Sequence, residues 1–123
     1  MTYTFIISDE SVNADGFVIQ TKGIRTERFK KDPVMLYMHA REKGVIGRWD
    51  NIRTEGSQLI ADAVFDENNP LGKEVKERVD GGFLRSASIG LSVLNYARIY
   101  GVDTVTHCEL TEVSIVDIPS NRN

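Results

Sequence analysis

The chain contains a single cysteine among its 123 residues. One cysteine cannot form an internal disulfide, and such sparse use is typical of proteins that fold in a reducing compartment. The N-terminus has neither the basic region nor the small-residue cleavage site of a secretory signal peptide. No stretch approaches the ~20 apolar residues that a transmembrane helix needs. The sequence therefore predicts a soluble cytoplasmic protein with no membrane partner.

An excess of positive charge is also missing. The chain has 15 Lys and Arg against 18 Asp and Glu, which gives a formal net charge of −3. Without a basic field, phosphate contacts cannot dominate binding, so we expect no nucleic-acid partner. Two isolated histidines and one cysteine lack the spacing of metal ligands, and no glycine-rich phosphate loop opens a helix. We expect neither a metal nor a cofactor.

What the sequence does contain is enough apolar residues, at 41% of the chain, to bury a core. There is no internal repeat and no linker, so residues 1–123 are expected to form one domain. Most apolar residues alternate with polar ones, which is typical of strands. The expected strands are 2–8, 17–20, 34–39, 45–51, 58–65, 83–94, 102–107 and 109–118. We expect the first two to form a hairpin.

One helix of good length is predicted after residue 69. Asn69 can cap it, Pro70 suits its first position, and Gly81 can end it in a left-handed conformation. Its apolar stripe, which recurs every four residues, consists of Leu71, Val75 and Val79. A short helical turn is expected at residues 27–29. Together these elements predict a mainly β fold, a closed or nearly closed β-barrel of short strands with one or two flanking helices.

Three side chains could combine as the components of a serine hydrolase, which are a hydroxyl, an imidazole and a carboxylate. His39 closes the apolar strand 34–39, and Ser88 lies on a small polar strand face that it shares with Ser86. Glu112 shares its strand face with Leu110 and Ser114, so burial there would require a partner for its charge.

Each of these residues also has a purely structural interpretation. His39 could be a core or rim histidine, the serines could line a solvent-exposed strand face, and Glu112 could lie in water on an edge strand. The neighbouring His107 and Cys108 point to opposite faces of a strand. Nothing near Cys108 marks a thiolate of low pKa, which argues against a cysteine nucleophile.

Four blocks of sequence resemble the caudovirus prohead proteases, which are related in fold to the herpesvirus assemblins. The blocks are DPVMLYMH at 32–39, IGR at 46–48, GFLRSASIGL at 82–91 and ELTEVSIVDIPSN at 109–121. They occur in the family's order, and the resemblance covers residues 16–121. It implies a barrel flanked by helices and a serine endopeptidase with no cofactor.

The resemblance also implies which residues act and where. His39 corresponds to the family's histidine, Ser88 to its serine and Glu112 to its acidic residue, and Ser86 competes with Ser88 as nucleophile. The implied substrates are the scaffolding protein and the major capsid protein, cleaved inside the assembling procapsid in the host bacterial cytoplasm. Assembly as a homo-oligomer stays open.

A second function of a different class is a catalytically inactive β-barrel that binds scaffold or capsid protein during procapsid assembly. The two hypotheses differ in one distance. A hydrolase needs the Ser88 hydroxyl within about 3 Å of a His39 nitrogen, with looser contacts in the free enzyme.

Overall fold

The structure is a computed structural model and describes residues 3–120. Its strands are β1 (Tyr3–Ser8), β2 (Phe17–Ile19), β3 (Ile24–Arg25), β4 (Val34–Tyr37), β5 (Gly47–Glu55), β6 (Gln58–Phe65), β7 (Ser86–Ile99) and β8 (Val102–Val116). The helices are α1 (Glu27–Lys31) and α2 (Pro70–Asp80), and two 3-10 turns are η1 (Thr21–Gly23) and η2 (Arg41–Lys43).

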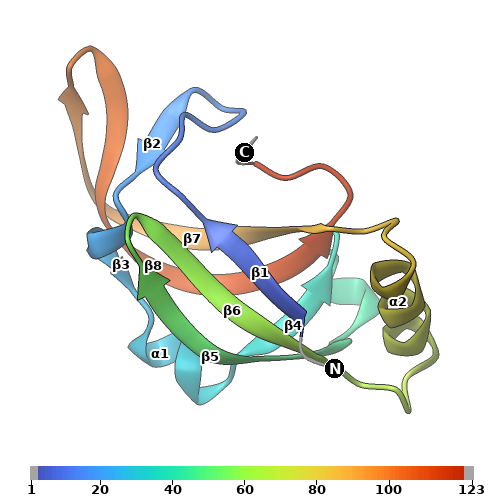
Figure 1. The fold of residues 1–123 in the computed structure, drawn as a ribbon. Helices are drawn as coiled ribbons and strands as arrows, with labels where there is room; N and C mark the ends of the chain where they lie inside the picture. The colour runs from blue at the N-terminus through green and yellow to red at the C-terminus, as the bar shows by residue number, and fades with distance from the viewer. Residues whose placement is uncertain (1–2, 121–123) are drawn as a thin grey trace.

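The strands form one curved sheet in the order β1-β6-β5-β4-β8-β2, and β3 and β7 also pair with β8 (Figure 1). The sheet curls until β1 and β7 approach each other, but no strand pairing joins them within the described residues. The barrel is therefore nearly closed, with one unsealed seam between β1 and β7. This confirms the predicted mainly β barrel with two helices.

The predicted hairpin between the first two strands is wrong. β1 pairs antiparallel with β6, whereas β2 pairs parallel with β8. The connecting loop is shaped by side-chain turns, in which Asp9 accepts the Ser11 N–H and Asn13 accepts the Asp15 N–H. Such turns redirect the chain, and the alternating pattern identifies a strand without identifying its partner. The Thr2 end of the predicted strand lies outside the described residues.

The last predicted strands are longer than expected and fewer. The two strands predicted at 102–107 and 109–118 are one strand, β8, which ends at Val116, and β7 continues to Ile99 before a tight turn at Tyr100 and Gly101. Both turn residues have positive φ, 50° and 76°, as a hairpin turn that follows the strand twist requires. The outer halves of β7 and β8 form a ribbon that projects from the barrel (Figure 1).

Helix α2 confirms the prediction at its start and corrects it at its end. The Asn69 side chain accepts hydrogen bonds from the N–H groups of Leu71 and Gly72, at 2.9 and 3.3 Å. Gly81 keeps a right-handed conformation with φ −79°, and Gly82 takes the left-handed one with φ 80°. The helix therefore closes one residue later than predicted. Its stripe of Leu71, Val75 and Val79 packs on the main core, as expected.

Trp49 ties the core to β8. Its side chain is 1% exposed, and its indole N–H donates to the carbonyl oxygen of Val113 at 3.1 Å. Phe5 meets its ring edge to face at 5.6 Å between centroids. Val113 and Ile115 are fully buried in the same core. Because strand side chains alternate, Glu112 and Ser114 must point away from the barrel interior.

Candidate functional site

The strand pairing between β7 and β8 brings the small polar residues onto one outer face. Ser88 lies opposite Ser114, and Gly90 lies opposite Glu112. Directly opposed residues in an antiparallel pair share a face, with Cα atoms about 5 Å apart. Their neighbours Ala87 and Val113 point into the core instead. The register between β7 and β8 therefore places the Ser88 hydroxyl on the same face as the Glu112 carboxylate.

A bulge in β8 corrects one sequence-based prediction. Gly90 opposes Glu112 while Leu91 opposes Leu110, so Thr111 has no opposite residue on β7. A bulge of this kind shifts the alternation by one residue. Leu110 consequently joins the core at 1% exposure, and Glu112 does not share its face as predicted. The bulge lies between Leu110 and Glu112, so the site residues Glu112 and Ser114 share the face opposite to that of Val113 and Ile115.

His39 lies in a turn, not at the end of a strand as predicted. β4 stops at Tyr37, and Met38 and His39 have φ 56° and 58°. The Ala40 N–H donates to the Tyr37 carbonyl oxygen at 2.9 Å. Positive φ at both central residues defines a type I′ turn, which usually takes Gly or Asn because other residues cost roughly 1–2 kcal/mol each there. Such strain is commonly found at functional sites.

Contacts with β8 hold this turn in place. The Met38 N–H donates to the Ile115 carbonyl oxygen at 2.9 Å, and the His39 N–H donates to the Ser114 hydroxyl oxygen at 3.1 Å. β4 runs parallel to β8, with Tyr37 opposite Ile115. The turn therefore returns the imidazole toward the strand that carries Glu112.

The imidazole and the carboxylate are in direct contact. Nδ1 of His39 bonds to Oε1 of Glu112, and Oε2 of Glu112 accepts a hydrogen bond from the Ser114 hydroxyl at 2.8 Å. Because Nδ1 faces a carboxylate acceptor, it carries the proton, which leaves Nε2 as the free acceptor in the neutral ring. This is the tautomer in which a histidine can act as a general base through Nε2.

Gly90 makes room for the carboxylate. A Cβ atom at this position would lie 2.7 Å from Oε1 of Glu112 and 2.9 Å from its Cγ. Such distances are shorter than van der Waals contact, so any larger residue would push the carboxylate from its position. The absence of a side chain at residue 90 therefore allows the Glu112–His39 contact.

Ser88 is buried at 3% exposure and faces a different partner from the one predicted. Its Oγ lies 3.0 Å from Oγ of Ser120, and no hydrogen bond joins it to His39 within residues 3–120. The Ala14 N–H fixes the main chain of Ser120 by donating to its carbonyl oxygen at 2.8 Å. Figure 1 shows the chain after β8 turning back toward the loop that precedes β2.

The structure thus brings His39 and Glu112 into contact. Ser88 of β7 lies directly opposite Ser114 of β8, and Ser114 bonds to both His39 and Glu112. Ser86 is the first residue of β7, two positions before Ser88, and lies opposite Val116 and away from Glu112. Sequence reasoning missed Ser114 and Ser120. The period-two spacing of Ser114 from Glu112 could have indicated the first, whereas no local pattern marks Ser120.

The other chemically reactive groups are placed less favourably. Cys108 is fully buried, and this burial raises the pKa of its thiol, which disfavours the thiolate form. Among residues 3–120, no cluster of three or more His, Cys, Asp or Glu side chains could hold a metal ion. None of the helices in that range has the length and apolar character to cross a membrane.

The barrel carries an imidazole–carboxylate pair beside a strand that bears a serine. These are the chemical groups of a serine protease. Comparison with known families agrees with that class, since the family model of the caudovirus prohead serine proteases matches residues 8–123. The chain belongs to this family, as its resemblance predicted. No curated protein and no solved structure matches the chain. Membership implies a protease of phage maturation that acts within the procapsid on capsid-related proteins.

Proposed function

We propose that the protein is an active serine endopeptidase, with Ser88 as nucleophile, His39 as general base and Glu112 as the residue that orients His39. Its substrates are precursor segments of the scaffolding protein or the major capsid protein, cleaved in the procapsid within the host cytoplasm. The observation that carries the proposal is the bond from His39 Nδ1 to Glu112, on the strand face that Ser88 shares. The family match supports the reaction class.

The chemistry is acyl transfer. As the Ser88 oxygen attacks a peptide carbonyl carbon, Nε2 of His39 takes the hydroxyl proton, and Glu112 stabilises the resulting imidazolium. When the tetrahedral intermediate collapses, the C–N bond breaks and His39 gives its proton to the leaving amine. Water then attacks the Ser88 ester with His39 again as base, which releases the acid and restores the hydroxyl.

Ser114 is the positioning residue of this proposal. It donates to Glu112 Oε2 and accepts from the main-chain N–H of His39, so it connects the carboxylate with the turn that carries the base. Ser114 is fully buried, and a buried hydroxyl with both partners satisfied holds its neighbours in one arrangement. It touches no reacting atom in this mechanism.

The inactive binding module is the second candidate, and one observation favours it. The Ser88 hydroxyl is buried against Ser120 in place of His39. In that case the barrel would bind scaffold or capsid protein without cutting it.

The test combines a fluorophosphonate probe, mapped by mass spectrometry, with cleavage of co-expressed scaffold and capsid precursor. We expect labelling at Ser88, and loss of both labelling and cleavage in Ser88→Ala and His39→Ala. Ser92→Ala, on the exposed part of β7, is the matched serine control. Glu112→Gln should lower the labelling rate by a factor on the order of 10⁴, because the wrong tautomer is then favoured. Glu109→Gln on the same strand should leave the rate unchanged.

The outcomes separate the hypotheses. Cleavage that persists in Ser88→Ala but is lost in Ser86→Ala would move the nucleophile to Ser86. Precursor binding without labelling or cleavage in the wild-type protein would establish the binding module.

A further inference from the structure

The seam of the barrel is lined by two strand edges that have no partner. Within residues 3–120, β1 pairs only with β6 and β7 pairs only with β8, although β1 and β7 are in contact. Figure 1 shows β1 crossing in front of β7 at this place. Unpaired edges leave main-chain N–H and C=O groups free to bind an extended peptide.

A cavity of about 220 Å³ opens at this seam, between β1 from Thr4 onward with the following Asp9, the start of β7 and Pro119. Cofactor and drug sites usually measure about 300–1,000 Å³, so this cavity is small for such ligands. It corresponds to the liquid volume of roughly seven water molecules. That space suits one amino-acid side chain.

The lining combines apolar walls with two polar residues, Ser8 and Arg85, whose side chains have no partner for a carboxylate to displace within the described residues. Phe5, Ile7 and Ala87 belong to the core and supply the apolar walls. The Ser8 hydroxyl is buried and has no hydrogen-bond partner among the described residues. A buried hydroxyl without a partner is unfavourable, so an occupant that offers an acceptor oxygen would be stabilised.

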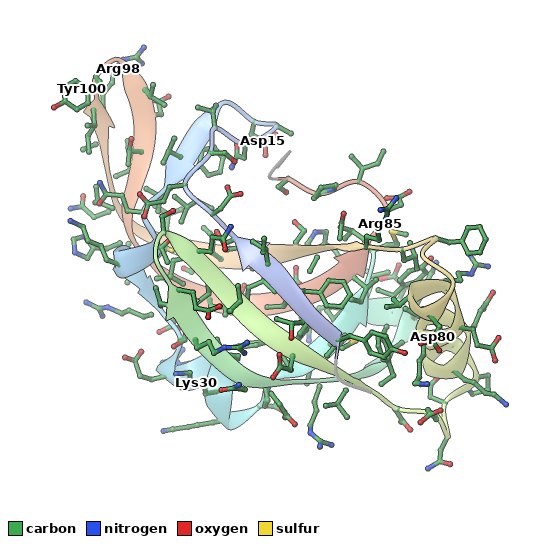
Figure 2. The ribbon with its side chains drawn as sticks, viewed as in Figure 1. Asp15, Lys30, Asp80, Arg85, Arg98 and Tyr100 are labelled. Atoms are coloured by element: carbon green, nitrogen blue, oxygen red, sulfur yellow. The ribbon has the colours of Figure 1, made fainter. Side chains whose placement is uncertain are left out.

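Arg85 is the positively charged residue of the cavity lining. It is exposed, and it forms no ion pair within the described part of the chain. The other charged residue of the lining, Asp9, already accepts hydrogen bonds from the N–H and hydroxyl of Ser11. A guanidinium binds carboxylates through paired N–H donors. Figure 2 shows Arg85 near the start of β7 and the end of β8, far from Arg98 at the tip of the ribbon.

The cavity adjoins the proposed nucleophile. Ser86 and Ala87 line it, and Ser88 is the next residue of β7. Pro119 also lines it and precedes Ser120, which bonds to Ser88. Strands rise about 3.3 Å per residue, and the β7 residues Ser86 and Ala87 that line the cavity are two and one positions before Ser88.

We propose that this seam cavity is a side-chain subsite that takes a glutamate of the peptide substrate, with the carboxylate bound by Arg85 and the Ser8 hydroxyl. The glutamate would lie one or two residues from the cleaved bond. The subsite rests on the proposed function for its role in cleavage, but its ability to bind a peptide can be tested without cleavage.

The experiment uses the full chain with Ser88→Ala, so that no peptide is cut. Eight-residue peptides of alanine and serine, with one central Glu, Gln, Leu or Lys, are titrated while backbone amide shifts are recorded by NMR. We expect the Glu peptide to shift the amides of Ser8 and Ala87 and to bind at least five-fold more tightly than the Leu peptide. Arg85→Glu should reverse the preference toward Lys, whereas the same charge change in Arg98→Glu should leave it unaltered.

Ser8→Ala provides a second test, because the stability of the free protein and the binding of the Glu peptide should respond differently to it. Removing an unpartnered buried hydroxyl should leave the melting temperature of the free protein unchanged or raise it, yet weaken binding of the Glu peptide. Shifts confined to other regions, an unchanged preference in Arg85→Glu, or no binding of any peptide would overturn the subsite. Retained Glu binding with no fluorophosphonate labelling of wild-type Ser88 would overturn the protease mechanism and leave the subsite standing.

Discussion

The hydroxyl oxygens of Ser88 and Ser120 lie 3.0 Å apart and share one hydrogen bond. A hydroxyl has one proton to donate, so Ser88 cannot give it to Ser120 and to His39 at the same time. The Ala14 N–H fixes the main chain of Ser120 by donating to its carbonyl oxygen. Either oxygen can be the donor of this bond, and where Ser88 is the donor it must leave Ser120 before its proton can pass to His39.

Ser120→Ala should make Ser88 more reactive. The variant loses one hydrogen bond, whose net contribution of about 0.5–1.5 kcal/mol corresponds to a roughly two- to twelve-fold higher labelling rate with a fluorophosphonate. Ile118→Ala changes an exposed residue of the same segment and serves as control. A labelling rate that is equal or lower in Ser120→Ala would show that the contact does not restrain Ser88.

Gly90→Ala should impair the site more than the fold. The new methyl group would lie 2.7 Å from Glu112 Oε1, so the carboxylate must move away from His39. Because Glu112 is the flexible partner, we expect less than about 1 kcal/mol loss of unfolding free energy in urea. The Ser88 labelling rate should nevertheless fall at least ten-fold.

A double-mutant cycle checks that Gly90→Ala acts through Glu112. In a Glu112→Gln background, where the carboxylate is already absent, Gly90→Ala should cause little further loss of labelling. Full additivity of the two substitutions would indicate that residue 90 affects the site by another route.

Asp62 should make stability depend on acid pH. The Thr4 hydroxyl, which donates to Asp62 at 2.8 Å, is the main cause that lowers the pKa of this carboxyl from 3.8, with Asn51 and Arg53 helping and burial opposing. A group whose pKa is lower in the folded state stabilises it above the unfolded pKa, and the effect disappears as pH falls through the folded pKa. Asp62→Asn should therefore cost about 1 kcal/mol at pH 7, since the network is partly exposed.

Urea unfolding at a series of pH values measures this effect. The stability difference between wild type and Asp62→Asn should be constant above pH 5 and shrink as pH falls below 3.8. Asp103→Asn, which removes an exposed ion pair with Arg98, should change stability little at any pH. A difference that stays constant to pH 2 would mean that the charge of Asp62 is not involved.

Cys108 should be inert in the folded protein. Burial raises the pKa of its thiol, so little thiolate is present at pH 8, and the sulfur is also shielded from reagents. We expect alkylation by iodoacetamide to be at least about a hundred-fold slower in buffer than in concentrated urea. Rapid alkylation with simultaneous loss of proteolysis would revive a cysteine nucleophile.

Local sequence was sufficient for several of the individual elements. The alternation of Tyr3, Phe5 and Ile7 predicted the first strand, and the pairing of Asn69 with Pro70 predicted the start of α2. The strand number and composition also led to the barrel, because short strands that bury apolar residues on nearly both faces must close on themselves or pack in layers. The chemical types of His39, Ser88 and Glu112 were recognisable from the family resemblance.

Partner choice and the details of the site depend on the tertiary structure. β8 pairs with β2, β3, β4 and β7, and pairing of strands far apart in sequence leaves no local pattern. The left-handed turn at His39 goes against the residue preferences of such turns, and it persists because β8 provides acceptors for its N–H groups. The bulge at Thr111 and the Ser88–Ser120 contact likewise arise only when distant segments meet. The sequence determined which groups are available, and folding decided which of them touch, because hydrogen bonds between distant segments form only once the backbone register is set.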